Sequence, residues 1–336
     1  MPQNVARRPY NHCRYAGNNG DVWKHVSLLE VLRNLASRNP KSFHYVETHA
    51  GPGYARLGEN GDWRRGIGRY MQGAVMTPCH PYFDLVLPGM QENLLYKGSW
   101  VLVAEYLRNV GHPNFKLTLH EINADTLKMA ASAIRKGQLS SWAQLQPKSG
   151  YDALNKLDFA DFILIDPPYR SSDGTADDWE KVMAAVNKAR TTSRNWMVWY
   201  PVFRRDEPDE LLRASGGTAF ELTWAPDAPG WVMKGCGLLT DPETASLMQF
   251  QPGMLRTLAD SLGGLATIRM LNGDCLESLT LNSGLSAPEA QPAEQISPAH
   301  HDLTGLRGDA EFLGNPIEFG ERGVVFKEPQ PSLMSR

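Results

Sequence analysis

Apolar runs alternate with amphipathic segments along most of the chain, and this alternation predicts strands that are followed by helices. Five runs are expected to form strands: residues 42–50, 115–123, 143–150, 161–166 and 195–202. A glycine-rich turn follows the first run, and segments with helical spacing follow the other four. Strands that alternate with helices of about 10–15 residues indicate a parallel sheet covered on both faces. The expected fold is therefore α/β, with a Rossmann-like sheet and helices on both faces.

Two groups of residues depart from this alternation. Shorter apolar runs at 219–225, 236–240 and 265–271 predict strands that close the edge of the sheet. Residues 54–98 are rich in Arg, Trp, Gly and Met, and they separate the first strand's turn from the next helical pattern. They predict a small inserted subdomain, helical in character, over one edge of the sheet.

The end of the chain differs in composition from the rest. Residues 282–310 have the Pro, Ala, Ser and Gln content that is typical of a flexible linker, and residues 311–336 have little core-forming content. The expected organisation has three parts: a Rossmann-like domain (1–53 and 99–280), an insertion that faces the substrate (54–98), and a flexible linker with a C-terminal tail (281–336).

Composition narrows the class of protein. With 336 residues, 42% of them hydrophobic, the chain can bury a substantial core. No apolar run approaches the roughly 18 residues of a membrane span, and the N-terminus lacks the apolar core of a secretory signal. The four cysteines have no metal-like spacing. We expect a cytoplasmic protein with reduced thiols, no metal and no membrane association.

The predicted strands end in residues that suit a ligand site. In doubly wound sheets, ligands bind beyond the carboxyl ends of the strands. The first strand ends in "ETHAGPG", where Gly51 and Gly53 allow a tight turn close to a ligand and His49 points into the same space. The second ends at Glu121, whose carboxylate can accept hydrogen bonds from both ribose hydroxyls of NAD or of S-adenosylmethionine.

The motif "DPPY" distinguishes these two ligands. Two prolines fix the backbone after Asp166 and remove two N–H donors, so the Pro167 carbonyl is expected to be free beside the Asp166 carboxylate. Two acceptors at fixed positions suit the two hydrogens of an exocyclic amine on a planar base. Tyr169 can stack on the face of that base, a contact worth about 1–3 kcal/mol in nucleic-acid binders. The motif thus predicts methylation of an amino group.

Six segments of the chain together match one known family: "YNHCRYAGNNGDVWKHVSLLEVL", "ETHAGPGYARL", "GSWVLVAEYLR", "HEIN", "DFILIDPPY" and "WYPV". On these segments the chain resembles the RlmJ family of 23S ribosomal RNA methyltransferases over about residues 8–275. The resemblance implies a class I methyltransferase sheet with a small inserted subdomain. It also implies S-adenosylmethionine as cofactor and N6 of an adenine in 23S ribosomal RNA as the methylated atom. A monomer is expected.

Individual residues of this chain match residues that bind the cofactor in the family. Lys24 and His25 are similar to residues that hold the methionine end of the cofactor, and His49 and Ser99 resemble further cofactor contacts. Glu121 is similar to the acid that binds the ribose.

Other residues of this chain match the family's catalytic and substrate-binding residues. Asp166 matches the catalytic acid and a cofactor contact, and Tyr10 resembles a tyrosine beside the target base. Arg64 and Arg65 in the insertion are the residues we expect to contact RNA.

One departure from the family concerns the adenine end of the cofactor. Where the family carries Asp-Gly, this chain has Ser149-Gly150. A hydroxyl accepts a hydrogen bond from the adenine amine less strongly than a carboxylate does, so the resemblance implies weaker cofactor binding here.

Three other functions share parts of this pattern. A DNA adenine-N6 methyltransferase would use the same DPPY motif. A nicotinamide oxidoreductase would share the sheet and the acid at position 121, but the chain lacks the strict G-x-G-x-x-G fingerprint. A non-catalytic RNA-binding module could retain a relic of the cofactor pocket, an idea that Ser149 and the added tail favour.

Overall fold

The computed structural model describes residues 12–281, with gaps at 40, 74, 76, 170–178, 194, 204–206, 225–232 and 249–253, and residues 318–320 and 323–325. The chain divides into two compact units, Met1–Leu285 and Ser286–Arg336. In the second unit, β12 (Glu318–Gly320) pairs antiparallel with β13 (Gly323–Val325). The remainder of the predicted linker and tail beyond Leu281 lies outside the described residues.

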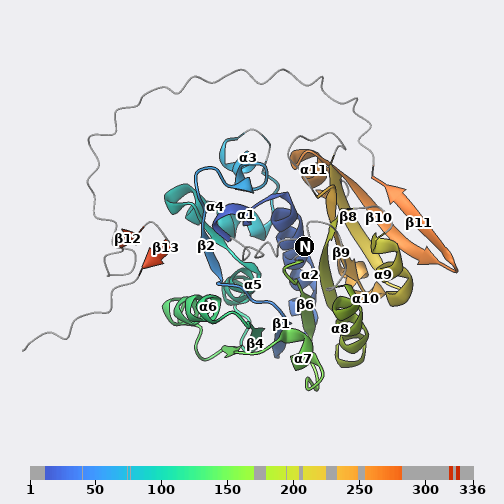
Figure 1. Ribbon diagram of the computed structural model, residues 1–336, viewed down its shortest axis with the longest axis horizontal. Helices are drawn as coiled ribbons and strands as arrows, with labels where there is room; N and C mark the ends of the chain where they lie inside the picture. The colour runs from blue at the N-terminus through green and yellow to red at the C-terminus, as the bar shows by residue number, and fades with distance from the viewer. Residues whose placement is uncertain are drawn as a thin grey trace, which may run out of the picture. The chain divides into compact units, whose positions relative to one another are not determined.

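The first unit is built on a nine-stranded sheet in the order β11-β10-β8-β9-β7-β6-β1-β4-β5 (Figure 1). Five strands run parallel: β7 (Trp196–Val202), β6 (Phe162–Ile165), β1 (Phe43–Glu47), β4 (Phe115–His120) and β5 (Ala143–Gln146). These are the five strands that the sequence predicts. Four further strands are antiparallel to their neighbours: β9 (Gly235–Thr240), β8 (Thr218–Trp224), β10 (Gly264–Asn272) and β11 (Cys275–Thr280).

Helices cover both faces of the sheet, as expected. One face is packed by residues of α2 (Asn19–Arg38), α5 (Ser99–Asn109), α6 (Ala124–Lys136), α10 (Pro242–Leu247) and α11 (Met254–Ser261). The other is packed by α7 (Gly150–Leu154), α8 (Trp179–Thr192) and α9 (Glu207–Ser215). Successive residues of β6 enter the two cores in turn, Phe162 and Leu164 on one face and Ile163 and Ile165 on the other. This two-sided burial explains why β6 is apolar without interruption.

The prediction that the last three apolar runs form edge strands is wrong. β8, β9 and β10 all lie inside the sheet, and the edge on this side is β11, which the sequence pattern does not predict. All six residues of β9 are buried, so the strand must be covered on both faces. β11 is mostly exposed and mixes Leu, Glu, Ser and Thr, so it carries no apolar pattern.

The insertion is not helical throughout. It holds η1 (Asp62–Arg64), α3 (Gly68–Met71) and α4 (Pro81–Asn93), but β2 (Tyr54–Arg56) and β3 (Leu95–Lys97) pair antiparallel at its two ends. This pairing brings the start and end of the insertion together beside α5. In Figure 1 the insertion and the β10–β11 hairpin lie on opposite sides of α2.

Helix α2 is a further element that the sequence pattern does not predict. It follows the short helix α1 (His12–Tyr15) and is capped by Asn18, whose side chain accepts a hydrogen bond from the Asp21 N–H. Most of its 20 residues are buried, among them the polar residues Lys24, His25 and Glu30. A helix that is covered on most sides shows no amphipathic stripe, so periodicity does not reveal it. Across the described residues, none of the helices has the length and apolarity that crossing a bilayer requires.

Candidate active site

The topology puts the expected ligand crevice at the carboxyl ends of β1 and β6. From β1 the chain crosses to β4 on one side, whereas β6 pairs with β1 on the other side. Neighbouring strands whose connections leave in opposite directions form a switch point, the usual ligand site of such sheets. The glycine turn follows β1, Glu121 follows β4, and Asp166 follows β6. The three predicted strand ends therefore meet at one edge.

The glycine turn after β1 has the tight backbone that the sequence predicts. Gly51 and Gly53 have φ values of 63° and 83°, in the left-handed region that favours glycine. A Cβ atom on Gly53 would lie 2.2 Å from the indole ring of Trp100. The Gly98 N–H, just before α5, donates to the Gly53 carbonyl at 2.7 Å. The turn is therefore fixed against the start of α5.

Asp166 forms a partly buried ion pair with Lys24 that joins segments 142 residues apart. The Lys24 ammonium lies 2.6 Å from Asp166 Oδ2 and 2.9 Å from Asp21 Oδ1. Asp21 is itself fixed, because its Oδ2 accepts a hydrogen bond from the Gly17 N–H at 2.9 Å. The Lys24 side chain is 8% exposed and that of Asp166 is 18% exposed. Lys24 is thus shared by two carboxylates, whereas the sequence predicts that it holds the cofactor.

The charges of this cluster depend on one another. Burial raises the pKa of Asp166, and the Lys24 ammonium opposes that rise. Burial alone would lower the pKa of Lys24, but Asp166 and Asp21 outweigh it and raise that pKa. For Asp21 the effect of burial is overcome by the Lys24 ammonium and by the hydrogen bond from the Gly17 N–H, which hold its pKa below the usual value. We infer that Lys24 carries a proton and keeps Asp166 ionised.

The Pro167 carbonyl is not free, which corrects the prediction from the two prolines. It accepts a hydrogen bond from the Tyr169 N–H at 2.9 Å. Proline removes donors only at its own nitrogen, and the next residue with an N–H reaches back across the turn. A carbonyl oxygen has two lone pairs, so Pro167 retains one acceptor position. The Tyr169 hydroxyl donates to the Trp199 carbonyl at 2.8 Å, and its ring packs against those of Trp179 and Trp199.

Two of the predicted cofactor residues make hydrogen bonds within the protein. Glu121 accepts from the Gly51 N–H at 3.2 Å and from the Asn123 N–H at 2.7 Å, so its carboxylate ties the end of β4 to the glycine turn. His49 Nδ1 lies 2.8 Å from the Thr48 hydroxyl, and its ring packs edge-on against Tyr151 of α7. Both residues lie at the crevice.

Ser149 and Gly150 reach the same edge through a close backbone contact. Ser149 caps α7, and its side chain makes no capping hydrogen bond to that helix. A Cβ atom on Gly150 would lie 2.1 Å from the Thr48 carbonyl oxygen, so only glycine lets α7 approach the end of β1 this closely. Gly150 therefore has a structural role in addition to the predicted cofactor contact.

His25 lies beside Lys24 and links the site to the insertion. Its Nδ1 is 2.8 Å from the hydroxyl of Tyr96 in β3, which is 3.1 Å from the hydroxyl of Tyr82 in α4. Burial and the Lys24 charge lower the pKa of His25 to about 3, so the imidazole is neutral. His25 is 2% exposed, and its Nε2 has no hydrogen-bond partner among the described residues.

Glu47 is a candidate that the sequence interpretation misses. It is the last residue of β1, and its carboxyl accepts hydrogen bonds from Ser99 and from Tyr45. Ser99, a predicted cofactor contact, is therefore bonded to an acid inside the protein. The available signal was an acidic residue at the end of an otherwise apolar strand.

The structure describes only some of the residues that are predicted to contact the substrate. Tyr10 lies outside the described residues. Arg64 and Arg65 are exposed, and the Arg64 guanidinium packs over the buried Trp63 ring and donates to the Glu59 carbonyl at 2.6 Å. The Ile67 N–H that follows them donates to the Gly17 carbonyl at 3.0 Å. The two arginines thus lie near the loop that precedes α2 and its Lys24.

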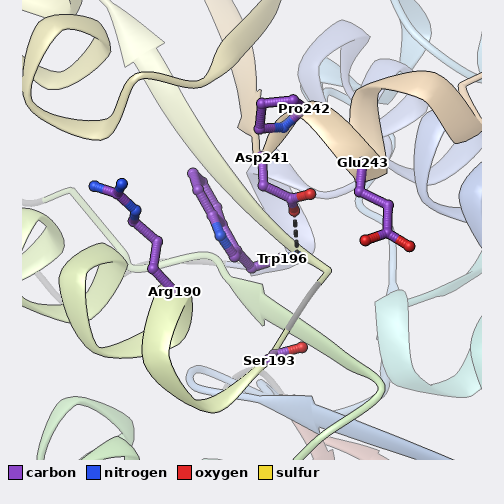
Figure 2. A pocket seen from close by; sticks show the side chains of 6 residues that line it. All are labelled: Arg190, Ser193, Trp196, Asp241, Pro242 and Glu243. Carbon is purple, nitrogen blue, oxygen red and sulfur yellow. Dashed lines mark hydrogen bonds between the residues drawn. The ribbon is translucent and has the colours of Figure 1, made fainter.

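A pocket at the opposite end of the sheet is separate from this crevice. Figure 2 shows its lining residues: Arg190, Ser193, Trp196, Asp241, Pro242 and Glu243. Asp241 accepts hydrogen bonds from the Trp196 N–H at 3.0 Å and the Thr244 N–H at 2.8 Å, so its carboxylate has a structural role there. None of the predicted site residues lines this pocket. Within the described residues, no group of three or more His, Cys, Asp or Glu side chains could hold a metal ion.

Comparisons with known proteins identify relatives of this chain. The family model described as "RsmJ: Ribosomal RNA large subunit methyltransferase D, RlmJ" matches residues 40–264. "Ribosomal RNA large subunit methyltransferase J" of Haemophilus influenzae is 27% identical over 290 residues, which cover 78% of this chain and 98% of that protein. The Escherichia coli protein of the same name is 26% identical over 250 residues, 68% of this chain and 85% of that protein.

A solved structure shows the same fold. The crystal structure of protein LPL1258 from Legionella pneumophila matches with a TM-score of 0.61 at 23% identity, and the match covers 77% of this chain and 99% of that one.

Proposed function

Because the chain belongs to the RlmJ family of ribosomal RNA large subunit methyltransferases, we propose that it transfers a methyl group from S-adenosylmethionine to N6 of an adenine in 23S ribosomal RNA. One observation supports an amino nitrogen as the methylated atom. The Asp166 carboxylate follows β6, is bound by Lys24, and is adjacent in the chain to Pro167 and its carbonyl. The Asp166 carboxylate and the Pro167 carbonyl both belong to the segment that follows β6, the strand next to β1 and its glycine turn.

The crevice has features that fit the methyl donor. Its glycine turn leaves room for a close ligand, Glu121 offers carboxylate oxygens at the end of β4, and Ser149 leaves the start of α7 uncapped by a side chain. His25 adds a buried Nε2 without a partner among the described residues. When bound, S-adenosylmethionine supplies an activated methyl group on a sulfonium sulfur. Glu121, His49, Gly51, Ser99, Ser149 and Gly150 are the residues we assign to holding it.

Asp166 and Pro167 would orient the attacking amine. Asp166 Oδ2 is bonded to Lys24, which leaves Oδ1 for a substrate N–H, and the second lone pair of the Pro167 carbonyl can accept the other N–H. Holding both hydrogens directs the nitrogen lone pair toward the crevice. Positioning of this kind supplies much of the rate in a displacement whose methyl group is already activated.

A proton must leave N6 once the new nitrogen–carbon bond has formed and the carbon–sulfur bond has broken. Asp166 can accept it, because Lys24 keeps the carboxylate ionised beforehand. The Asp166 side chain is 18% exposed, so water can also take the proton.

The target base must leave its stack to reach this crevice. Extrusion of a base costs a few kcal/mol, which favours loops and naked or partly assembled ribosomal RNA. Tyr169, fixed through Trp199, offers a ring for stacking, and Tyr10 is assigned a place beside the base on the family resemblance alone. Arg64 and Arg65 of the insertion are the exposed cations that we assign to the phosphate backbone.

Reversing the charge of Arg64 and Arg65 together (R64E/R65E) should weaken RNA binding and reduce its salt dependence. Each lost phosphate contact lowers the slope of log K against log salt by about 1, so a decrease of about 2 is expected. The measurement is a fluorescence titration of a 23S fragment at several salt concentrations. The control makes the same charge change at Lys188 and Arg190, at the end of α8, and should leave the slope unchanged. An unaltered slope in R64E/R65E would assign the RNA surface to another part of the chain.

A competition assay distinguishes RNA from DNA as the substrate. The full chain is incubated with radiolabelled S-adenosylmethionine and equal amounts of naked 23S ribosomal RNA and adenine-containing DNA. We expect the label to enter RNA at least about tenfold faster, because the extruded RNA base is taken from unpaired loops. Label in DNA alone would support the DNA adenine methyltransferase, and label in neither would support a relic pocket.

A further inference from the structure

Trp199 is a large aromatic residue next to Asp166 in the sheet, and the mechanism above does not use its ring. β6 and β7 are parallel neighbours, and Ile165 lies opposite Val198. The residues that follow this pair are Asp166 and Trp199, and equivalent residues of neighbouring strands direct their side chains to the same face. Trp199 packs against the core that α2 covers, and Asp166 binds Lys24 of α2. Both side chains thus lie on the α2 face of the sheet.

The Trp199 indole lies against the start of α2 and near the ring of Tyr169. A Cβ atom on Gly20, in the first turn of α2, would lie 3.4 Å from this indole. The ring centroids of Trp199 and Tyr169 are 5.8 Å apart, and the Tyr169 hydroxyl donates to the Trp199 carbonyl at 2.8 Å. Tyr169 and Trp179, however, pack against the core on the other face of the sheet. Of the two rings nearest the Asp166 segment, Trp199 is therefore the one on the face of the Asp166 carboxylate.

The Trp199 side chain is partly exposed, unlike the rest of its strand. The other six residues of β7 are buried, and Trp196 of the same strand is 1% exposed. A ring that served the core alone would gain from full burial, as Trp196 does. Trp199 lies instead toward the carboxyl end of a parallel strand, which is where ligands bind in such sheets. This position favours a ring that a bound ligand covers.

We propose that Trp199 is a substrate-binding residue whose indole stacks on the extruded target base while Asp166 and Pro167 hold the amine of that base. The inference rests on the proposed function. A base that donates its amine hydrogens to these acceptors points its edge at them, and its flat faces remain for neighbouring side chains. Stacking on an aromatic ring replaces the stacking that the base loses when it leaves the RNA. An aliphatic side chain could cover the base but has no π face to offer.

The test compares aromatic and aliphatic replacements of Trp199 in the full chain, with naked 23S ribosomal RNA as substrate. Trp199→Leu should lower kcat/KM for the RNA at least about tenfold, whereas Trp199→Phe, which keeps a ring, should stay within about threefold of the wild type. Binding of S-adenosylhomocysteine, measured by calorimetry, should change less than about twofold in both variants, because Trp199 is assigned to the base and not to the donor. Trp199→Met should match Trp199→Leu, and it carries the comparison if the leucine variant loses donor binding.

A matched control is Trp179→Leu, which removes the other indole that packs against Tyr169, at a centroid distance of 5.4 Å. It should lower kcat/KM less than about threefold. An equal loss in Trp179→Leu and Trp199→Leu would assign the effect to the packing of Tyr169 and overturn the inference. Equal losses in Trp199→Phe and Trp199→Leu with donor binding intact, or no loss in Trp199→Leu, would also overturn it. These outcomes leave the proposed function in place, whereas a wild-type chain that transfers no methyl group to RNA would remove the proposed function, and this inference with it.

Discussion

Replacing Asp166 with asparagine is expected to reduce methyl transfer to naked 23S ribosomal RNA at least about a thousandfold, while the chain still binds the donor. Asparagine keeps the shape of the side chain but loses the negative charge that pairs with Lys24 at 2.6 Å. Its amide can also present N–H groups where the substrate amine needs an acceptor. The transfer is measured with radiolabelled S-adenosylmethionine, and donor binding by calorimetry.

Asp21→Asn is the matched control for this prediction. Asp21 is the other carboxylate on the same ammonium, at 2.9 Å, but Asp21 belongs to α2 and does not follow a strand of the crevice. Its loss leaves the Lys24–Asp166 pair in place, so the transfer rate should fall less than about tenfold. Turnover of D166N at the wild-type rate would remove the carboxylate from the mechanism.

Replacing Lys24 with methionine should have the second largest effect. Without the ammonium, burial and Asp21 both favour the protonated form of Asp166, so the pKa of Asp166 rises further. A protonated acid cannot accept from the substrate amine. Transfer at neutral pH should fall about a hundredfold or more, and it should recover in part as pH rises through the raised pKa. The free energy of unfolding should also fall by about 3 kcal/mol, because two partly buried carboxylates lose their shared ammonium partner.

The control for Lys24→Met is the same substitution at a lysine outside the crevice. Lys97 forms a partly buried pair with Glu105 at 2.7 Å, and Lys97→Met should lower the free energy of unfolding by about 1 kcal/mol and leave the pH profile of transfer unchanged. Urea unfolding and transfer assays between pH 6 and 9 measure both effects. A pH profile of Lys24→Met that matches the wild-type profile would contradict the role assigned to Lys24.

The parallel half of the sheet could be predicted from the sequence because its signals are local. The run "FILI" of β6 is apolar throughout since both of its faces are buried. The bounds of α6 were predictable to the residue, because Asn123 caps its start and Gly137 follows its end. Neither signal depends on what packs against the segment.

The antiparallel half of the sheet was harder to predict from the sequence. Whether β8, β9 and β10 lie at the edge or inside depends on how many strands come after them, and β11 is too exposed to show a pattern. The strand pair β2–β3 joins two segments of three residues across the insertion, too short for periodicity to reveal. Helix α2 is hidden for the opposite reason, since it is buried on most sides.

For the site, the sequence predicted which residues gather but not what they bind to within the protein. Residues at strand ends meet because parallel strands end at one edge, so Gly51, Glu121 and Asp166 were predictable together. The contact of Lys24 with Asp166 spans 142 residues, and only the fold brings the two together. The Pro167–Tyr169 hydrogen bond depends on the turn geometry after the prolines. Glu47 looked like part of an ordinary strand until its burial was known.

The central claim is tested most directly by identifying the product nucleoside. Naked 23S ribosomal RNA is incubated with the full chain and S-adenosylmethionine, digested to nucleosides and examined by mass spectrometry, with D166N in parallel. The proposed chemistry predicts N6-methyladenosine in the wild-type reaction and none with D166N. Methylation of a ribose, of another base or of a ring nitrogen, or equal product from D166N, would contradict it.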